Sequence, residues 1–109
     1  MVVHKQNDPT LNRIVDIIVK TVSPSKIILF GSRARGDSSE NSDYDIFILK
    51  DSNENERKIT TRLYRQFYEE HIDKDIDLVA ASSEKMKKNI ATTGFIYKNI
   101  NEEGIILYE

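Results

Sequence analysis

The chain has 109 residues, a formal net charge of −2 at pH 7 and no cysteine. A chain of this length forms one domain, which we expect to span residues 1–109, and the lack of cysteine excludes disulfides and thiolate metal sites. No apolar run approaches the roughly 18 residues that span a bilayer, and no signal-peptide core is present, so we expect a cytoplasmic protein without membrane contact. The slight acidity argues against nucleic acid as a partner, because domains that bind duplexes usually carry excess positive charge.

The first half of the chain combines one helical pattern with two strand patterns. Asp8 and Pro9 predict a helix start, and apolar residues then recur every three or four positions as far as Val22. Residues 26–30 and 43–49 are rich in β-branched and large apolar side chains, which predicts two strands. We expect these strands to be antiparallel, with residues 31–42 as the loop between them.

The second half predicts three helices and two strands. A cap at residues 51–53 should begin a helix of roughly 18 residues that ends near His71. The segments expected after it are a strand at 75–80, a helix from 82 that is interrupted at 92–94, a helix at 95–103 and an edge strand at 105–108. This order predicts an α+β, two-layer fold, in which a small mixed sheet of about four strands is packed with helices.

Two aspartates, Asp43 and Asp45, stand at the start of the second predicted strand. Alternate strand residues share a face, so the two carboxylates should project together, roughly 6.6 Å apart at about 3.3 Å per residue. Like charges repel unless a cation lies between them, and oxygen ligands favour a hard ion such as Mg²⁺. Taken alone, the pair is more typical of a solvated strand end. Together with the preceding loop, it predicts a magnesium site.

That loop carries the residue types that bind phosphate. Gly31 allows main-chain N–H groups to approach a ligand, Ser32 supplies a hydroxyl, and Arg33 and Arg35 supply positive charge. The competing interpretations are an ordinary turn at a strand exit for the first two residues and solvated loop charges for the arginines. A nucleophilic serine would need a base, and no histidine lies near it in the sequence.

The pattern Gly31-Ser32-x-Ala34-Arg35-Gly36, followed by Ser42-Asp43-x-Asp45, resembles the signature of the minimal nucleotidyltransferases. These are small members of the DNA polymerase β-like superfamily, and the resemblance covers nearly the whole chain. It implies the polymerase β-like nucleotidyltransferase fold. It also implies a third carboxylate between two apolar residues, which Asp77 matches, with Asp75 as the rival on the same predicted face.

The resemblance further implies Mg²⁺-dependent transfer of AMP from ATP to a hydroxyl group. The implied ligands of two Mg²⁺ ions are Asp43, Asp45 and Asp77, and the implied phosphate-binding residues are Gly31, Ser32, Arg33 and Arg35. Family members are often paired with a HEPN-domain ribonuclease toxin that they adenylylate on a tyrosine, so this chain is expected to be the antitoxin of such a pair.

Two alternatives stay open at this stage. One is a non-catalytic antitoxin that silences its partner by covering it, and the other is one subunit of a small-molecule adenylyltransferase. If the domain is catalytic, its small size leaves the acceptor side open, to be completed by a second copy or by a different protein. We expect the partner surface to include the aromatic residues Tyr64, Phe67 and Tyr68 and the strand at residues 105–108.

Overall fold

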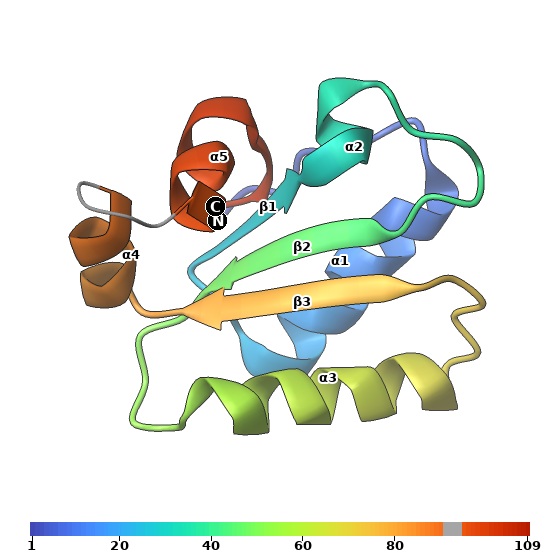
Figure 1. Ribbon diagram of the computed structural model, residues 1–109. Coiled ribbons are helices and arrows are strands. Elements are labelled where there is room, and N and C mark those ends of the chain that lie inside the picture. Colours follow the sequence, from blue (N-terminus) through green and yellow to red (C-terminus); the bar gives the residue numbers. More distant parts are fainter. Residues whose placement is uncertain (91–94) are drawn as a thin grey trace.

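A four-stranded sheet with the strand order β3-β2-β1-β4 lies at the centre of the fold (Figure 1). The computed structural model describes residues 1–90 and 95–109. Its strands are β1 (Lys26–Phe30), β2 (Tyr44–Leu49), β3 (Ile76–Ala81) and β4 (Ile105–Tyr108). β1 is antiparallel to both β2 and β4, whereas β2 and β3 are parallel. The mixed sheet confirms the predicted α+β class and the antiparallel pairing of the first two strands.

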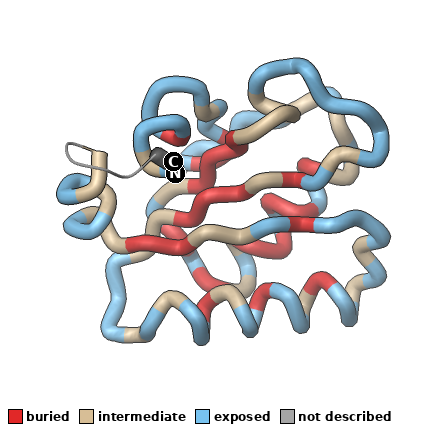
Figure 2. The backbone as a smooth tube through the Cα atoms, viewed as in Figure 1, coloured by how far each residue is buried: buried red, intermediate tan, exposed pale blue. Residues whose placement is uncertain are grey.

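Helices cover both faces of this sheet, and the alternation of strand side chains decides which residues face them. The helices are α1 (Pro9–Val22), α2 (Gly31–Arg35), α3 (Glu56–Glu69), α4 (Ser83–Ile90) and α5 (Phe95–Glu103). α1 and α3 pack on the face that carries Ile46 and Ile48, in the larger core. On the other face, Phe47 packs with Ile100 of α5 in a smaller core. Figure 2 shows the buried positions concentrated along the strands and the inner sides of the helices.

The first helix follows its sequence signals closely. The Asp8 carboxylate accepts hydrogen bonds from the main-chain N–H groups of Thr10 and Leu11, at 3.0 and 3.2 Å, and Pro9 occupies the first turn. Such a cap satisfies N–H groups that have no partner within the helix. All of its apolar positions except the partly buried Val19 lie buried in the larger core, as the periodicity predicts.

Several predicted boundaries were wrong. Residues 31–35 form the short helix α2 inside the expected loop, and Gly36 ends it in the left-handed conformation. α3 begins at Glu56 rather than near residue 51, because Asn55 is its cap and accepts from the N–H of Lys58 at 2.9 Å. The Asp51 carboxylate instead accepts from Ser83 at the start of α4. β3 extends one residue further than expected, to Ala81. The expected interruption at residues 92–94 lies outside the described residues.

The outer edge of β4 is partly covered by the start of the chain. Main-chain hydrogen bonds join Val2 to Glu109 in both directions, and the N–H of His4 donates to the carbonyl of Leu107 at 2.9 Å. Strand edges with unpaired main-chain groups invite pairing with other chains, so this cover protects the edge. Within residues 1–90 and 95–109, no helix is both long enough and apolar enough to span a membrane.

Candidate active site

The topology brings the ends of three strands together beside α2. Phe30, the last residue of β1, is in register with Asp45 near the start of β2, because these strands are antiparallel. Asp45 is in turn in register with Asp77 at the start of the parallel strand β3. Gly31 follows Phe30 directly, so the glycine and the two aspartates meet at one end of the sheet, next to α2 (Figure 1).

Three carboxylates form one electrostatic cluster at this end. Desolvation raises the pKa of Asp45, which is half-buried, and the negative charges of Asp77 and Asp43 raise that pKa further. Arg35 acts in the opposite direction and lowers it. These effects on the pKa of Asp45 indicate that Asp43 and Asp77 both lie within range of its charge.

Asp75, the rival third carboxylate, lies one position before the first residue of β3. Its main-chain carbonyl accepts the N–H of Tyr44 at 3.0 Å, which starts the pairing between β2 and β3. The in-register partner of Asp45 is Asp77, not Asp75. The geometry therefore favours Asp77 as the third member of the cluster.

The donor set fits a magnesium ion shared with a phosphate better than a metal site made by protein alone. Among the described residues, no three His, Asp or Glu side chains are arranged to hold a metal ion by themselves. Mg²⁺ is usually bound by one or two carboxylates together with waters and substrate phosphates. Asp45 of β2 and Asp43, which directly precedes this strand, would supply such a pair of oxygen ligands, and Asp77 would add a third carboxylate from the neighbouring strand.

Removing one of these charges should stabilise the protein without ligand. In the variant Asp45→Asn, the repulsion from Asp77 and Asp43 and the cost of burying the charge both disappear, so we expect a higher melting temperature at pH 7 without metal. The folded-state pKa of Asp45 lies above the ordinary value of 3.8. The free energy of unfolding of the wild type therefore falls as the pH rises from the ordinary value through the folded-state pKa. Thermal denaturation should show the gap between variant and wild type narrowing as pH falls towards 3.8. An unchanged or lower melting temperature at pH 7 would contradict the clustered arrangement.

The backbone conformation at Gly31 and its closeness to Asp45 both require a glycine at this position. Its φ is +73°, in the region that favours glycine, and a Cβ atom placed on it would overlap Oδ2 of Asp45. Ser32 follows in the first turn of α2, half-buried, and its main-chain carbonyl accepts from the N–H groups of Gly36 and Asp37. The structure therefore places Gly31 directly beside the Asp45 carboxylate, with Ser32 next along the chain.

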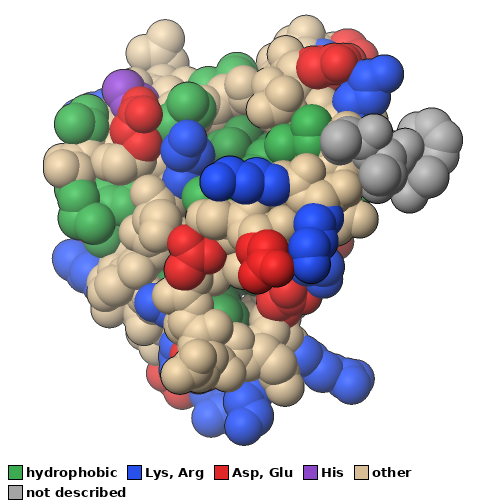
Figure 3. Space-filling model, turned by 90° about the vertical axis from the view of Figure 1, so that its left-hand side faces the viewer, with side chains coloured by type: hydrophobic (Ala, Val, Ile, Leu, Met, Phe, Trp, Pro, Cys, Tyr) green, Lys and Arg blue, Asp and Glu red, His purple; other side chains and the backbone are tan. Residues whose placement is uncertain are grey.

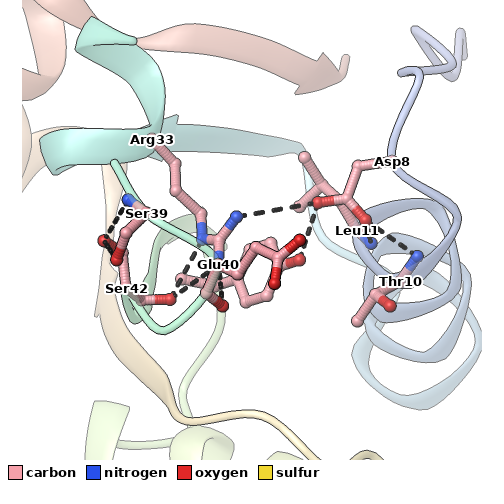
Figure 4. Close-up of polar contacts among 8 residues, drawn as sticks. Asp8, Thr10, Leu11, Arg33, Ser39, Glu40 and Ser42 are labelled. Atoms are coloured by element: carbon pink, nitrogen blue, oxygen red, sulfur yellow. Dashed lines mark hydrogen bonds and ion pairs between the residues drawn. The ribbon is translucent and has the colours of Figure 1, made fainter. Parts of the chain in front are cut away.

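The two arginines of α2 point to different surroundings. The Arg35 guanidinium forms ion pairs with Asp37 at 3.1 Å and with Glu103 of α5 at 3.8 Å, and its charge reaches Asp45. The Arg33 side chain, only 15% exposed, instead donates to main-chain carbonyls of the following loop (Figure 4). Of the two, Arg35 is the arginine that the structure brings to the carboxylates.

Two residues near the site were missed by the sequence interpretation. The Tyr44 hydroxyl donates to Oδ2 of Asp8 at 2.6 Å, and burial is the main cause that raises the pKa of Tyr44 to about 12, followed by the hydrogen bond to Asp8. Asp8 was assigned only as a helix cap. The contact joins residues that are 36 positions apart, so no local pattern could reveal it.

A hollow of about 290 Å³ lies at the opposite end of the strands, between the sheet and the helices α4 and α5. Its lining is mainly apolar, with Lys26 and Lys87 among the lining residues. Figure 3 shows this end of the molecule, with hydrophobic side chains flanked by basic ones. The hollow is remote from the carboxylates, so it is not part of the candidate active site.

Comparison with known proteins supplies the deciding observation for the family. The family model "Polymerase beta, Nucleotidyltransferase" matches residues 12–109. The chain belongs to this nucleotidyltransferase family. No curated protein sequence matches it significantly.

Solved structures agree on the fold of this nucleotidyltransferase domain. A toxin–antitoxin structure with AMP-PNP matches with a TM-score of 0.66 and 20% identity, covering 93% of this chain and 73% of that one. A mutant of the toxin–antitoxin pair MntA–HpeT matches with a TM-score of 0.64 and 20% identity, covering 89% of this chain and 71% of that one. A Sulfolobus solfataricus protein assigned as a nucleotidyltransferase matches with a TM-score of 0.59 and 18% identity, covering 89% of this chain and 75% of that one. These similarities confirm the polymerase β-like fold.

Proposed function

We propose that this nucleotidyltransferase domain transfers AMP from ATP to a hydroxyl group of a partner protein, in a Mg²⁺-dependent reaction. The observation that carries the proposal is the meeting of Asp43, Asp45 and Asp77 beside Gly31 at one end of the sheet. Three carboxylates at one end of the sheet, next to a glycine turn, would provide oxygen ligands and an approach for phosphate at the same point.

Each residue has a defined role in this proposal. Asp43 and Asp45 would hold Mg²⁺, and Asp77 would be a ligand of a second ion; when bound, these ions would supply positive charge that offsets the charge of the phosphates. The main chain at Gly31 and the Ser32 hydroxyl bind the β- and γ-phosphates, and the charge of Arg35 offsets that of the carboxylates.

Asp77 also assists removal of the proton from the acceptor hydroxyl. The acceptor oxygen then forms a bond to the α-phosphorus of ATP, and the bond from this phosphorus to the bridging oxygen of the β-phosphate breaks. AMP is left on the acceptor, and the remaining two phosphates leave as pyrophosphate.

Nucleotide binding can be tested apart from transfer. With Mg²⁺ present, ATP at about 100 times its dissociation constant should stabilise the fold by about 2.7 kcal/mol, which is several degrees in melting temperature. Mg²⁺ without ATP should give a much smaller shift, because the phosphates complete the ion's ligands. The absence of any shift with Mg-ATP would contradict nucleotide binding at this site.

The partner of this domain is, in our proposal, a toxin protein. Two of the structural relatives are toxin–antitoxin structures, one of them with AMP-PNP. The sequence resemblance adds the narrower proposal of a HEPN-domain ribonuclease as the toxin and one of its tyrosines as the acceptor. This chain would then act as the antitoxin by modifying its partner.

The expected partner surface needs correction. Phe67 is buried in the larger core, and Leu107 and Tyr108 are buried as well, so none of these three is available for contact. Tyr68 is 83% exposed and Tyr64 is 43% exposed. Ile105 and Ile106 of β4 are each 37% exposed, but the start of the chain pairs along this edge, so we propose the exposed side of α3 as the docking surface instead of β4.

Tyr64 of α3 reaches the main chain of the edge strand β3 next to Asp77. The Tyr64 hydroxyl accepts the N–H of Leu78 at 2.9 Å, and Leu78 directly follows Asp77 on the edge strand β3. Arg57, Lys58 and Arg65 lie exposed on the same helix. The Asp77 side chain itself lies on the opposite sheet face, with that of Asp45, so a partner with an acidic surface that docks on α3 would extend around the edge of β3 to reach it.

Replacing Tyr68 tests this surface. Tyr68→Ala should weaken partner binding by about tenfold or more, the effect typical of an aromatic residue that carries binding energy. The control Lys98→Ala changes an exposed residue of α5, on the other face of the sheet. Affinities measured by calorimetry should separate the two variants. Equal weakening by both, or by neither, would contradict docking on α3.

A further inference from the structure

One guanidinium group connects four parts of the chain next to the carboxylates. Arg33 of α2 donates from Nε and Nη2 to the carbonyl of Ser42, at 3.1 and 2.8 Å, and from Nη2 to the carbonyl of Glu40 at 3.2 Å. Its Cζ lies 3.9 Å from the centre of the Tyr44 ring, and its Nη1 lies 4.0 Å from Oδ2 of Asp8. Figure 4 shows this side chain extending from α2 across the loop towards Asp8.

These contacts use the special features of an arginine side chain. A planar fork of N–H groups can donate twice to one carbonyl while its flat face lies over an aromatic ring. The Tyr44 ring is fixed in turn, because its hydroxyl donates to Asp8, whose other carboxylate oxygen caps α1. The guanidinium is therefore anchored, through Tyr44 and Asp8, to the start of α1.

The anchored group holds both neighbours of Asp43. Ser42 precedes Asp43, and its carbonyl receives the two shortest bonds from Arg33. Tyr44 follows Asp43, and its ring packs in the larger core, on the sheet face opposite Asp45. Asp43 itself is exposed and lies just outside β2, so its direction depends on how its two neighbours are held.

We propose that Arg33 is a positioning residue that sets the direction of the Asp43 carboxylate through Ser42 and Tyr44. The significance for catalysis rests on the nucleotidyl transfer proposed above, whereas the effect on the loop does not. Contact between Arg33 and phosphate, the role implied by the sequence, is the opposing hypothesis. The two hypotheses differ in whether a lysine, which keeps only the positive charge, can substitute for Arg33.

The test compares Arg33→Lys with Arg33→Gln. A lysine keeps the positive charge but lacks the fork and the flat face, so a positioning role is lost about equally in both variants. We expect kcat for transfer to fall by about 10- to 100-fold in each, the range typical of residues that orient metal ligands, with KM for ATP changed by less than about threefold. A near wild-type Arg33→Lys, or a large rise in KM with kcat unchanged, would overturn the proposal.

A second variant checks the same chain of contacts from its other end. Tyr44→Leu removes the ring beneath the guanidinium and the hydroxyl that bonds to Asp8, yet the side chain lies on the face opposite the carboxylates. It should reproduce the kcat loss of Arg33→Gln, and the double variant should lose little more, because the two residues act as one unit. Fully additive losses would count against the proposal.

A readout independent of activity separates this inference from the proposed function. Amide hydrogen exchange at Ser42 and Asp43 should be at least about tenfold faster in Arg33→Lys than in wild type, with exchange in α1 unchanged. Unchanged exchange at these two amides would overturn the positioning role, even if transfer is confirmed. If exchange is faster in Arg33→Lys but the wild-type protein transfers no AMP, the positioning role would be supported and the proposed function contradicted.

Discussion

Replacing both Asp43 and Asp45 by asparagine should abolish AMP transfer while leaving the fold intact. Asparagine has nearly the same size but no charge, so the variant keeps the packing of β2 and loses the paired metal ligands. We expect transfer to fall by roughly 10³-fold or more, which corresponds to about 4 kcal/mol of lost transition-state stabilisation. The melting shift caused by Mg-ATP should disappear as well, whereas circular dichroism should match wild type.

The matched control for this variant is Asp75→Asn. Asp75 is exposed and lies next to the site in the sequence, but its structural contribution is a main-chain carbonyl that asparagine retains. Its activity should stay within about threefold of wild type, the range of a surface change away from the chemistry. A double variant that still binds Mg-ATP as well as wild type would contradict the metal site. A loss in Asp75→Asn as large as in Asp77→Asn would contradict the choice of third carboxylate.

Gly31→Ala should be more harmful to nucleotide binding than to folding. The added Cβ occupies the place of the Asp45 carboxylate, so Asp45 must move away from its position beside Asp77. We expect Mg-ATP affinity and transfer to fall by about 100-fold or more, and stability by about 1–2 kcal/mol for the strained backbone. Gly31→Val should have the same effects in a stronger form.

Gly36→Ala provides a matched control for the backbone strain. Gly36 also has a positive φ, +83°, but a Cβ atom there would meet nothing within 4 Å. Both alanine variants should therefore lose similar stability, and only Gly31→Ala should lose nucleotide binding. Thermal denaturation and ATP titration on both proteins would measure this. Parallel losses of binding in the two variants would mean that Gly31 is only a structural turn.

Much of the fold follows from local patterns in the sequence. The helix capped by Asp8 has a regular apolar stripe, and the apolar runs of β1 and β2 are bounded by turn residues, so these elements were predicted correctly. α2 was missed because its five residues are too few to show a helical period. The boundary of α3 was wrong because residues 51–53 and Asn55 carry equally good capping side chains, and only tertiary contacts with Ser83 decide between them.

The candidate site was predictable where it depends on spacing along one strand. Asp43 and Asp45 could be identified as a pair because strand residues alternate between faces. That Asp77 joins them depends on the register of two parallel strands, which the sequence pattern alone does not determine. Phe67 illustrates the same limit. The sequence groups it with Tyr64 and Tyr68 as one aromatic cluster, but the helix buries the Phe67 ring and exposes that of Tyr68.

The interpretation of Arg33 depended on contacts that no local motif contains. Its guanidinium meets Tyr44 and Asp8, which lie 11 and 25 positions away in the chain. A basic residue in a glycine-containing loop resembles a phosphate ligand in the sequence, whether its charge points to substrate or to the protein. The structure distinguishes the two arginines, since the charge of Arg35 acts on Asp45 while Arg33 bonds to the loop.

The most direct test of the central claim follows the α-phosphate of ATP onto the partner. Wild-type protein, α-labelled ATP and Mg²⁺ are incubated with the cognate toxin, and labelled products are separated into protein and small molecules. We expect label bound stably to a hydroxyl of the toxin, pyrophosphate in equal amount, and no transfer by Asp77→Asn despite normal binding to the toxin. Equal labelling by Asp77→Asn would contradict its catalytic role. Wild-type protein that binds and silences the toxin without transferring label would contradict enzymatic function altogether.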